Sequence, residues 1–180
     1  MLTKKIYIGL GSNLGARERF LKSALEKLAE SSHIKITNVS PAYETEPVGF
    51  AGQGKYINLV AEITSDLGAR DLLHHLEKIE EKIGKKAEFK NGPREIDIDI
   101  LLYDKEVVES DYLTIPHPGL NRREFALRPL LDLNPKLVEP TTNTPYSVYL
   151  KRISGQKNVM EKKDLNLGSV SYTHLRAHET

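Results

Sequence analysis

The chain has 180 residues, of which 39% are hydrophobic and 28% are charged, and its net charge is +1. This length suits one domain with a substantial core, and the near-neutral charge argues against a nucleic-acid binder, which would normally carry a basic surface. The sequence has no cysteine, which excludes disulfides and thiolate metal sites and permits a reducing compartment. Because no apolar run is long enough for a signal peptide or a membrane span, we expect a soluble, cytoplasmic protein with no membrane partner.

Apolar periodicity divides the first hundred residues into alternating and helical segments. In chain order we expect a strand at 5–11, a helix around 21–28, a strand at 35–45, a strand at 56–64, a helix around 72–83 and a strand after Gly92. Ser12 and Asn13 offer turn or helix-capping chemistry before the first helix, Pro41 suggests an edge strand, and Gly84 should end the second helix. The order β-α-β-β-α-β predicts an α+β, ferredoxin-like domain whose antiparallel sheet carries both helices on one face.

The remaining sequence predicts a C-terminal helical extension. FALRPLLDL reads as a short helix despite Pro129, and an amphipathic turn covers 147–153. We expect a single domain over 1–160 and a disordered or non-native tail over 161–180. His174 and His178 in this tail have a spacing that can bind zinc on a helix, but no further ligands accompany them.

The segment GPREIDIDILLYD places two carboxylates on one face of the last strand. Side chains alternate along a strand, so Asp97 and Asp99 share one face while Ile96, Ile98 and Ile100 share the other. Two negative charges roughly 7 Å apart repel by about 2 to 3 kcal/mol at an effective dielectric near 20. Either an open, solvated face or a bound divalent metal would offset this repulsion, and the strand alone does not decide between them.

The same alternation gathers polar residues on the sheet face opposite the two helices. Its expected members are Tyr7, Gly9, Gly11, Tyr56, Asn58, Asp97 and Asp99. Glycines that clear space beside an aromatic ring, an amide and two carboxylates favour a binding site over a face that is merely wet, although antiparallel sheets tolerate a wet face well.

Basic residues flank the aspartate strand on both sides. The cations that precede it or open it are Lys85, Lys86, Lys90 and Arg94, and those that follow it are His117, Arg122 and Arg123. Two carboxylates beside basic loops fit a magnesium-bound polyphosphate, in which the carboxylates hold the metal and the cations neutralise phosphate oxygens. A solvated charged surface is the alternative for the lysines.

Four motifs in order resemble the 6-hydroxymethyl-7,8-dihydropterin pyrophosphokinase family. They are IGLGSNLG, YETEPVG followed by YINLV, NGPREIDIDIL, and IPHPGLNRREFALRPL, and together they span about 4–140. The resemblance implies a ferredoxin-like enzyme of folate biosynthesis that transfers pyrophosphate from ATP to the pterin hydroxymethyl group and releases AMP. It implies small-molecule substrates and no nucleic-acid partner, and we expect a monomer.

The resemblance also implies roles for individual residues. Asp97 and Asp99 resemble the ligands of two Mg²⁺ ions on the ATP phosphates, and Arg94, His117 and Arg123 resemble residues that contact those phosphates during catalysis. The further ATP-binding candidates are Glu80, Lys85, Lys86, Lys90, Ile100 and Thr114. The pterin-binding candidates are Thr45, Val48, Tyr56, Asn58 and Phe125.

Three of these residues have a structural alternative. His117 could be a loop histidine bonded to backbone, Phe125 a core residue, and Glu80 a surface glutamate. We interpret His117 as a hydrogen-bond donor to phosphate and not as a general base.

The sequence also departs from the family at several positions. Lysines stand in the loop before GPR where arginines are frequent, Asn91 stands where an aromatic is frequent, and Glu46 stands where proline is common. Lysine keeps the positive charge of arginine but loses its bidentate fork.

Two other classes of protein compete with this interpretation. GLGSNLG follows a strand as in dinucleotide-binding oxidoreductases, but the glycine spacing is loose and no acidic residue ends a parallel second strand. An RNA recognition module shares the order of strands and helices, but the two aspartates on the expected face would repel phosphate.

Overall fold

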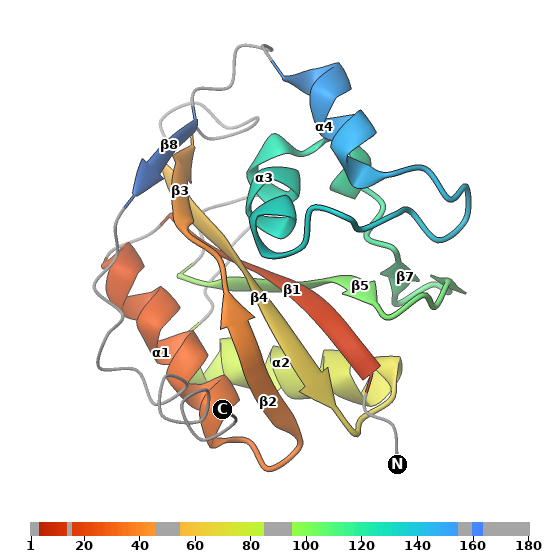
Figure 1. Ribbon diagram of the computed structural model, residues 1–180. Helices are drawn as coiled ribbons and strands as arrows, with labels where there is room; N and C mark the ends of the chain where they lie inside the picture. The colour runs from red at the N-terminus through yellow and green to blue at the C-terminus, as the bar shows by residue number, and fades with distance from the viewer. Residues whose placement is uncertain (1–3, 14–15, 46–54, 85–94, 155–159, 164–180) are drawn as a thin grey trace.

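The structure is a computed structural model that describes residues 4–13, 16–45, 55–84, 95–154 and 160–163 (Figure 1). Its main strands are β1 (Lys4–Ser12), β2 (Ile34–Val39), β3 (Ala42–Thr45), β4 (Tyr56–Ser65), β5 (Asp97–Tyr103) and β8 (Met160–Lys163). A small hairpin is formed by β6 (Val108–Glu109) and β7 (Thr114–Ile115). The helices are α1 (Arg17–Glu30), α2 (Ala69–Ile83), the 3-10 turn η1 (Leu120–Arg122), α3 (Glu124–Leu133) and α4 (Tyr146–Ile153). Within the described ranges, no helix combines the length and apolarity that a membrane span requires.

The main sheet confirms the expected ferredoxin-like order. Its strands lie in the order β5-β1-β4-β3-β8, with β2 also paired to β4, and β1 is antiparallel to both β4 and β5. Strands far apart in the sequence therefore become neighbours at the centre of the sheet. This arrangement places the end of β1 between the start of β5 on one side and the start of β4 on the other.

Helices α1 and α2 pack on one face of the sheet, as their apolar periodicity predicts. Leu21 and Leu28 of α1 and Leu72 and Leu76 of α2 are fully buried against strand residues of the larger core. Helix α2 ends at Gly84, whose φ of 103° is the left-handed conformation that favours glycine at a helix C-terminus. The predicted end of this helix is thus confirmed.

The strand expected over 35–45 is two strands. Pro41 lies between β2 and β3 and not inside a strand, because proline cannot donate to the ladder. Ser40 bridges the interruption: its amide donates to the Val60 carbonyl over 2.9 Å, and its Oγ accepts from the Val60 amide over 2.9 Å. Both pieces therefore remain attached to β4.

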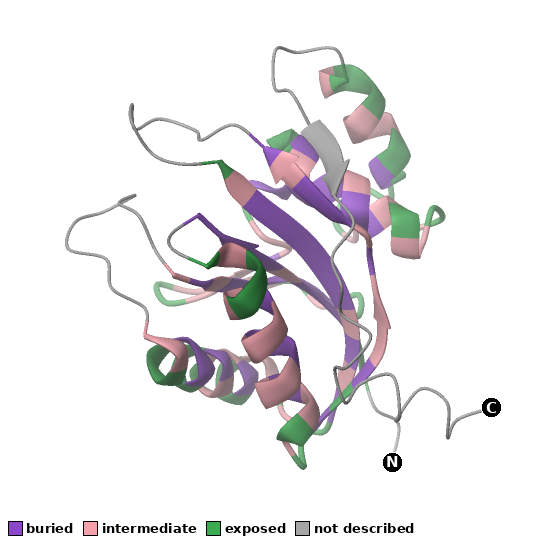
Figure 2. Cartoon of the chain, turned by 90° about the vertical axis from the view of Figure 1, so that its left-hand side faces the viewer, coloured by how far each residue is buried: buried purple, intermediate pink, exposed green. Residues whose placement is uncertain are grey.

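The face opposite α1 and α2 is only partly open, which corrects the expectation of a polar face. Helices α3 and α4 cover one part of it with a second core that contains Tyr7, Leu101, Leu102 and Val60 (Figure 2). A register shift between Tyr7 and Ile8 in the pairing of β1 with β5 breaks the period-two alternation, so consecutive leucines belong to the same core. Tyr7 is 2% exposed and donates to Glu62, so it is a core residue and not part of the site.

The C-terminal part agrees with the expected helical extension and adds a strand. Helix α3 contains Pro129, and α4 begins one residue before the predicted turn. Strand β8 pairs antiparallel with β3 (Figure 1), which the polar sequence after the last helix did not predict. The main sheet thus includes residues up to Lys163.

Candidate active site

A row of residues crosses three strands of the sheet, β5, β1 and β4, near the end of β1. In the strand register Gly11 of β1 pairs with Asp97 of β5 on one side and with Asn58 of β4 on the other. Paired residues point to the same sheet face, so the carboxylate of Asp97 and the amide of Asn58 flank a position that has no side chain. The strand register therefore joins the metal candidate to the pterin candidate.

A side chain at position 11 would displace the Asn58 amide. A Cβ atom on Gly11 would lie 2.6 Å from Asn58 Oδ1, closer than real contacts allow. Asn58 is buried, and its Nδ2 donates to Thr45 Oγ1 over 3.2 Å. Thr45 is buried and pairs with the half-buried Tyr56. Three of the predicted pterin residues, Thr45, Tyr56 and Asn58, thus lie together at the ends of β3 and β4.

The two aspartates lie on β5 as alternation predicts. Asp97 is half-buried, whereas the side chain of Asp99 is 52% exposed. No group of three or more His, Cys, Asp or Glu side chains in the described ranges could hold a metal by itself. Two carboxylates nevertheless fit Mg²⁺, which is usually bound through one or two carboxylates together with substrate phosphates and water.

Glu80 has a structural role that neither of its expected alternatives included. Its side chain is buried on α2, and its Oε2 accepts a hydrogen bond from the Ile98 amide over 2.8 Å. Strand β5 ends the order of the sheet, so this amide faces away from β1. The carboxylate thus fixes the backbone between Asp97 and Asp99.

Hydrogen bonds to the backbone orient the His117 ring so that its Nε2 atom faces Asp99. Its amide donates to the Leu101 carbonyl over 3.0 Å, and its Nδ1 accepts from the Gly119 amide over 3.1 Å. A nitrogen that accepts from an amide carries no proton, so Nε2 carries the proton in the neutral ring. Nε2 lies 3.9 Å from Asp99 Oδ2.

The pKa of His117 is lowered. Burial is the largest cause, the Asp99 carboxylate opposes it, and the Arg123 guanidinium adds to it. The neutral ring therefore has its Nε2–H on the Asp99 side. The expected alternative is also present, because the ring is bonded to backbone through Nδ1.

Arg123 and Phe125 lie next to each other where η1 passes into α3. The exposed Arg123 guanidinium is 5.7 Å from the centroid of the Phe125 ring. Phe125 is half-buried and packs against the second core, so one part of the ring serves the core and the other part stays accessible. A Cβ on Gly119 would lie 2.5 Å from Arg123 Nε, so the turn leaves room for this side chain.

The remaining candidates are either less accessible or undescribed. Ile100 is 3% exposed in the larger core, so its side chain is not available to a nucleotide, and only its backbone remains as a contact. Thr114 is half-buried in β7. Lys85, Lys86, Lys90, Arg94 and Val48 lie outside the described residues.

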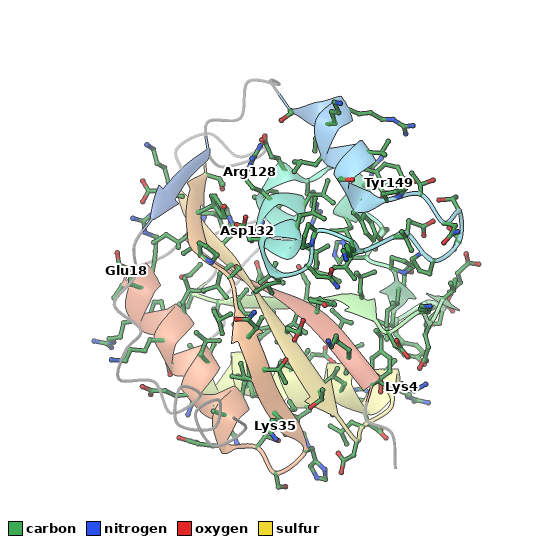
Figure 3. The ribbon with its side chains drawn as sticks, viewed as in Figure 1. Lys4, Glu18, Lys35, Arg128, Asp132 and Tyr149 are labelled. Atoms are coloured by element: carbon green, nitrogen blue, oxygen red, sulfur yellow. The ribbon has the colours of Figure 1, made fainter. Side chains whose placement is uncertain are left out.

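Two contacts near the site were not expected from the sequence. Ser12 is not a helix cap: it ends β1, and its hydroxyl donates to the Glu95 carbonyl just before β5. Tyr43 of β3 donates to the carboxylate of Asp132, which lies on the β3 side of α3 (Figure 3). Burial, followed by the bond to Asp132, raises the pKa of Tyr43 to about 12. These partners are far apart in the sequence, and no local pattern reports them.

Comparison with known proteins decides the family. A model of the family described as 7,8-dihydro-6-hydroxymethylpterin-pyrophosphokinase (HPPK) matches residues 7–135. The chain belongs to this family. A 2-amino-4-hydroxy-6-hydroxymethyldihydropteridine pyrophosphokinase of Aquifex aeolicus is 42% identical over 140 residues, which cover 78% of this chain and 86% of the relative. The enzyme of the same name from Bacillus subtilis is 35% identical and is covered over 93% of its length.

Other HPPK relatives are longer proteins. The folic acid synthesis protein fol1 of Schizosaccharomyces pombe is 41% identical over 153 residues, which are 85% of this chain but 21% of that protein. A crystal structure of Plasmodium falciparum HPPK-DHPS superposes with a TM-score of 0.66 at 16% identity and covers 84% of this chain and 45% of that chain. At this identity the structural match supports the fold.

Proposed function

We propose that this HPPK-family chain transfers pyrophosphate from ATP to the hydroxymethyl group of 6-hydroxymethyl-7,8-dihydropterin, releasing AMP, as a step of folate synthesis. The observation that carries this proposal is the pairing of Gly11 with both Asp97 and Asn58 on one sheet face. That pairing puts a carboxylate suited to a metal-bound phosphate beside an amide suited to a heterocycle. The space over Gly11 is where the two substrates would meet.

For the nucleotide, Asp97 and Asp99 would hold two Mg²⁺ ions. When bound, such ions neutralise the triphosphate, orient the β-phosphorus for in-line attack and can lower the pKa of the attacking hydroxyl. Glu80 keeps the strand between the two aspartates in place through the Ile98 amide. His117 would donate from Nε2 to a phosphate oxygen, and Arg94 and Arg123 would neutralise charge as it shifts during transfer.

For the pterin, Asn58 would present a donor and an acceptor to the aminopyrimidinone edge. Thr45 already accepts from Asn58 Nδ2, which fixes the orientation of the amide. Tyr56 would line the same side. The accessible part of the Phe125 ring would stack on the heterocycle.

We propose Mg²⁺ dependence, a monomer and a cytoplasmic location; the absence of cysteine is compatible with that location. Size-exclusion chromatography with light scattering would test the oligomeric state.

The activity is tested by measuring AMP formation from ATP with and without the pterin substrate and Mg²⁺. We expect AMP to form only when all three are present, and the pterin product to carry a diphosphate. Release of ADP or free phosphate in place of AMP would contradict transfer of pyrophosphate.

A further inference from the structure

We propose that Arg17, at the start of α1, is a positioning residue that holds together the two strand ends carrying the pterin candidates. It lies on the opposite side of the sheet from those candidates and would not touch substrate. This inference rests on the proposed pterin site. Arg17 would set the geometry of that site from the opposite face of the sheet.

Arg17 forms two hydrogen bonds to two different strand ends. Its Nη1 donates to the Lys55 carbonyl over 2.6 Å, and its Nη2 donates to Glu44 Oε2 over 3.3 Å. The side chains of Arg17 and Glu44 are 25% and 18% exposed, so the pair is only partly open to solvent. Such charge-assisted bonds are stronger than bonds between neutral groups. We refer to Arg17, Glu44 and Lys55 as the Arg17 bridge.

The Arg17 bridge is adjacent in sequence to the pterin side of the site. Glu44 directly precedes Thr45, and Lys55 directly precedes Tyr56. Thr45 and Tyr56 pair with each other in the register of β3 and β4. The Arg17 bridge therefore binds the residue just before Thr45 and the residue just before Tyr56, and so restrains the backbone on both sides of this pair.

Glu44 and Thr45 are neighbours in β3 but point to opposite faces of the sheet. Side chains alternate along β3, so Glu44 points to the face that α1 covers while Thr45 points to the opposite face and contacts Asn58. A shift of the backbone at Glu44 would therefore move Thr45 Oγ1, which accepts from Asn58 Nδ2. Displacing this acceptor would release the Asn58 amide from its fixed orientation.

The geometry requires an arginine. A guanidinium is planar and has five donors in a rigid fork, so it can reach a carbonyl and a carboxylate on separate strands at once. Lys55 Nζ also lies 3.9 Å from Glu44 Oε1, but that lysine side chain is 49% exposed, and exposed pairs contribute little. Losing Arg17 would thus remove the two side-chain hydrogen bonds that join the Lys55 carbonyl and the Glu44 carboxylate through one guanidinium.

The test compares Arg17→Gln and Arg17→Lys with Arg19→Gln. Arg19 is an exposed arginine of the same helix with no hydrogen bond or ion pair in the described part of the chain, so its variant controls for loss of charge. For each protein we would measure the Kd for 6-hydroxymethylpterin by fluorescence in the presence of a non-hydrolysable ATP analogue and Mg²⁺. The Kd for that analogue and the Tm would be measured alongside.

We expect Arg17→Gln to weaken pterin binding by about five- to tenfold, the effect of losing about one charged hydrogen bond, and to leave the Kd for the ATP analogue within about twofold. Arg17→Lys should recover part of the loss, and Arg19→Gln should match the unmodified protein. Unchanged pterin binding in Arg17→Gln would overturn the inference. Equal weakening of both ligands together with a lower Tm would also overturn it, because that result indicates a general structural role.

Asn58→Ala separates the failure of this inference from failure of the proposed site. If Asn58→Ala weakens pterin binding and Arg17→Gln does not, only the role of Arg17 is wrong. If Asn58→Ala also leaves pterin binding unchanged, the pterin site itself is misassigned, and the inference falls with it.

Discussion

Glu80 accepts a hydrogen bond from the Ile98 amide over 2.8 Å, and this contact connects α2 to the strand that bears both aspartates. The amide lies between Asp97 and Asp99 on the edge of the sheet away from β1. An edge strand has backbone donors without a strand partner on one side. The buried carboxylate satisfies one of them at the point where the geometry of the site depends on it.

Glu80→Ala should therefore destabilise the protein and loosen β5. Removing the acceptor leaves a buried amide without its partner, which costs about 1 to 3 kcal/mol in the free energy of unfolding. Glu80→Gln retains an acceptor oxygen and should lose less. Denaturant unfolding together with hydrogen exchange at the Ile98 amide measures both effects, and an Ile98 amide that stays equally protected in Glu80→Ala would show that the contact is not needed.

Gly11→Ala should disturb the pterin side. The new methyl would meet Asn58 Oδ1 at 2.6 Å, so the Asn58 amide must shift and its hydrogen bond to Thr45 Oγ1 would be disturbed. We expect the KM for the pterin to rise by about tenfold, since one hydrogen bond and one oriented amide are lost. Gly68→Ala is the matched control, because a Cβ there meets nothing within 4 Å. Equal pterin KM values for the two variants would contradict this account of Gly11.

His117 should be neutral at pH 7 and protonated on Nε2. Burial lowers its pKa, and the Gly119 amide donates to Nδ1. Long-range ¹⁵N–¹H NMR correlations distinguish the two tautomers of the imidazole and should report a protonated Nε2 in the free protein. A proton found on Nδ1 would remove His117 as a donor on the side of Asp99.

Glu139 should make stability depend on pH in the acid range. Burial alone would raise its pKa, but hydrogen bonds from Thr141 and Thr142 outweigh burial and lower the pKa below the ordinary value of 4.5. The unfolded chain then binds a proton more readily than the folded one. The contribution of this carboxylate is complete above pH 4.5 and is lost as the pH falls through the lower folded pKa.

Glu139→Gln should therefore reduce the free energy of unfolding by about 2 kcal/mol at pH 7, which is the effect of weakening charged hydrogen bonds, and by less at pH 3. Glu109→Gln, at an exposed position of β6, is the control and should change stability at neither pH. A difference between Glu139→Gln and the unmodified protein that stays constant from pH 7 to pH 3 would contradict the lowered pKa.

Period-two and helical patterns predicted the elements of the ferredoxin-like fold because their causes are local. The apolar stripe of α2 and the left-handed Gly84 are encoded within one segment, and so is the shared face of Asp97 and Asp99. The sequence did not predict the second core, because the register shift opposite Tyr7 and Ile8 depends on the pairing of β1 with β5. Alternation alone assigns Tyr7 to the open face, whereas α3 and α4 bury it.

The contacts that support the site are non-local for the same reason. Glu80 with Ile98, Tyr43 with Asp132 and Arg17 with Lys55 each join residues on different elements. The residue types alone do not indicate which of these side chains will pair, because the pairing depends on the order of the strands in the sheet. The reacting groups could be proposed from motifs, whereas the groups that position them required the structure.

The most direct test of the central claim, that Asp97 and Asp99 bind the magnesium of the nucleotide, is AMP formation as a function of Mg²⁺ concentration in Asp97→Asn and Asp99→Asn. Asp104→Asn is the control: it lies just after the same strand, and asparagine tolerates its φ of 51°. We predict a loss of at least about a hundredfold in kcat/KM for each site variant at saturating Mg²⁺, with an unchanged Tm, and normal activity for the control. Turnover and Mg²⁺ dependence that remain like those of the unmodified protein in both site variants would contradict the claim.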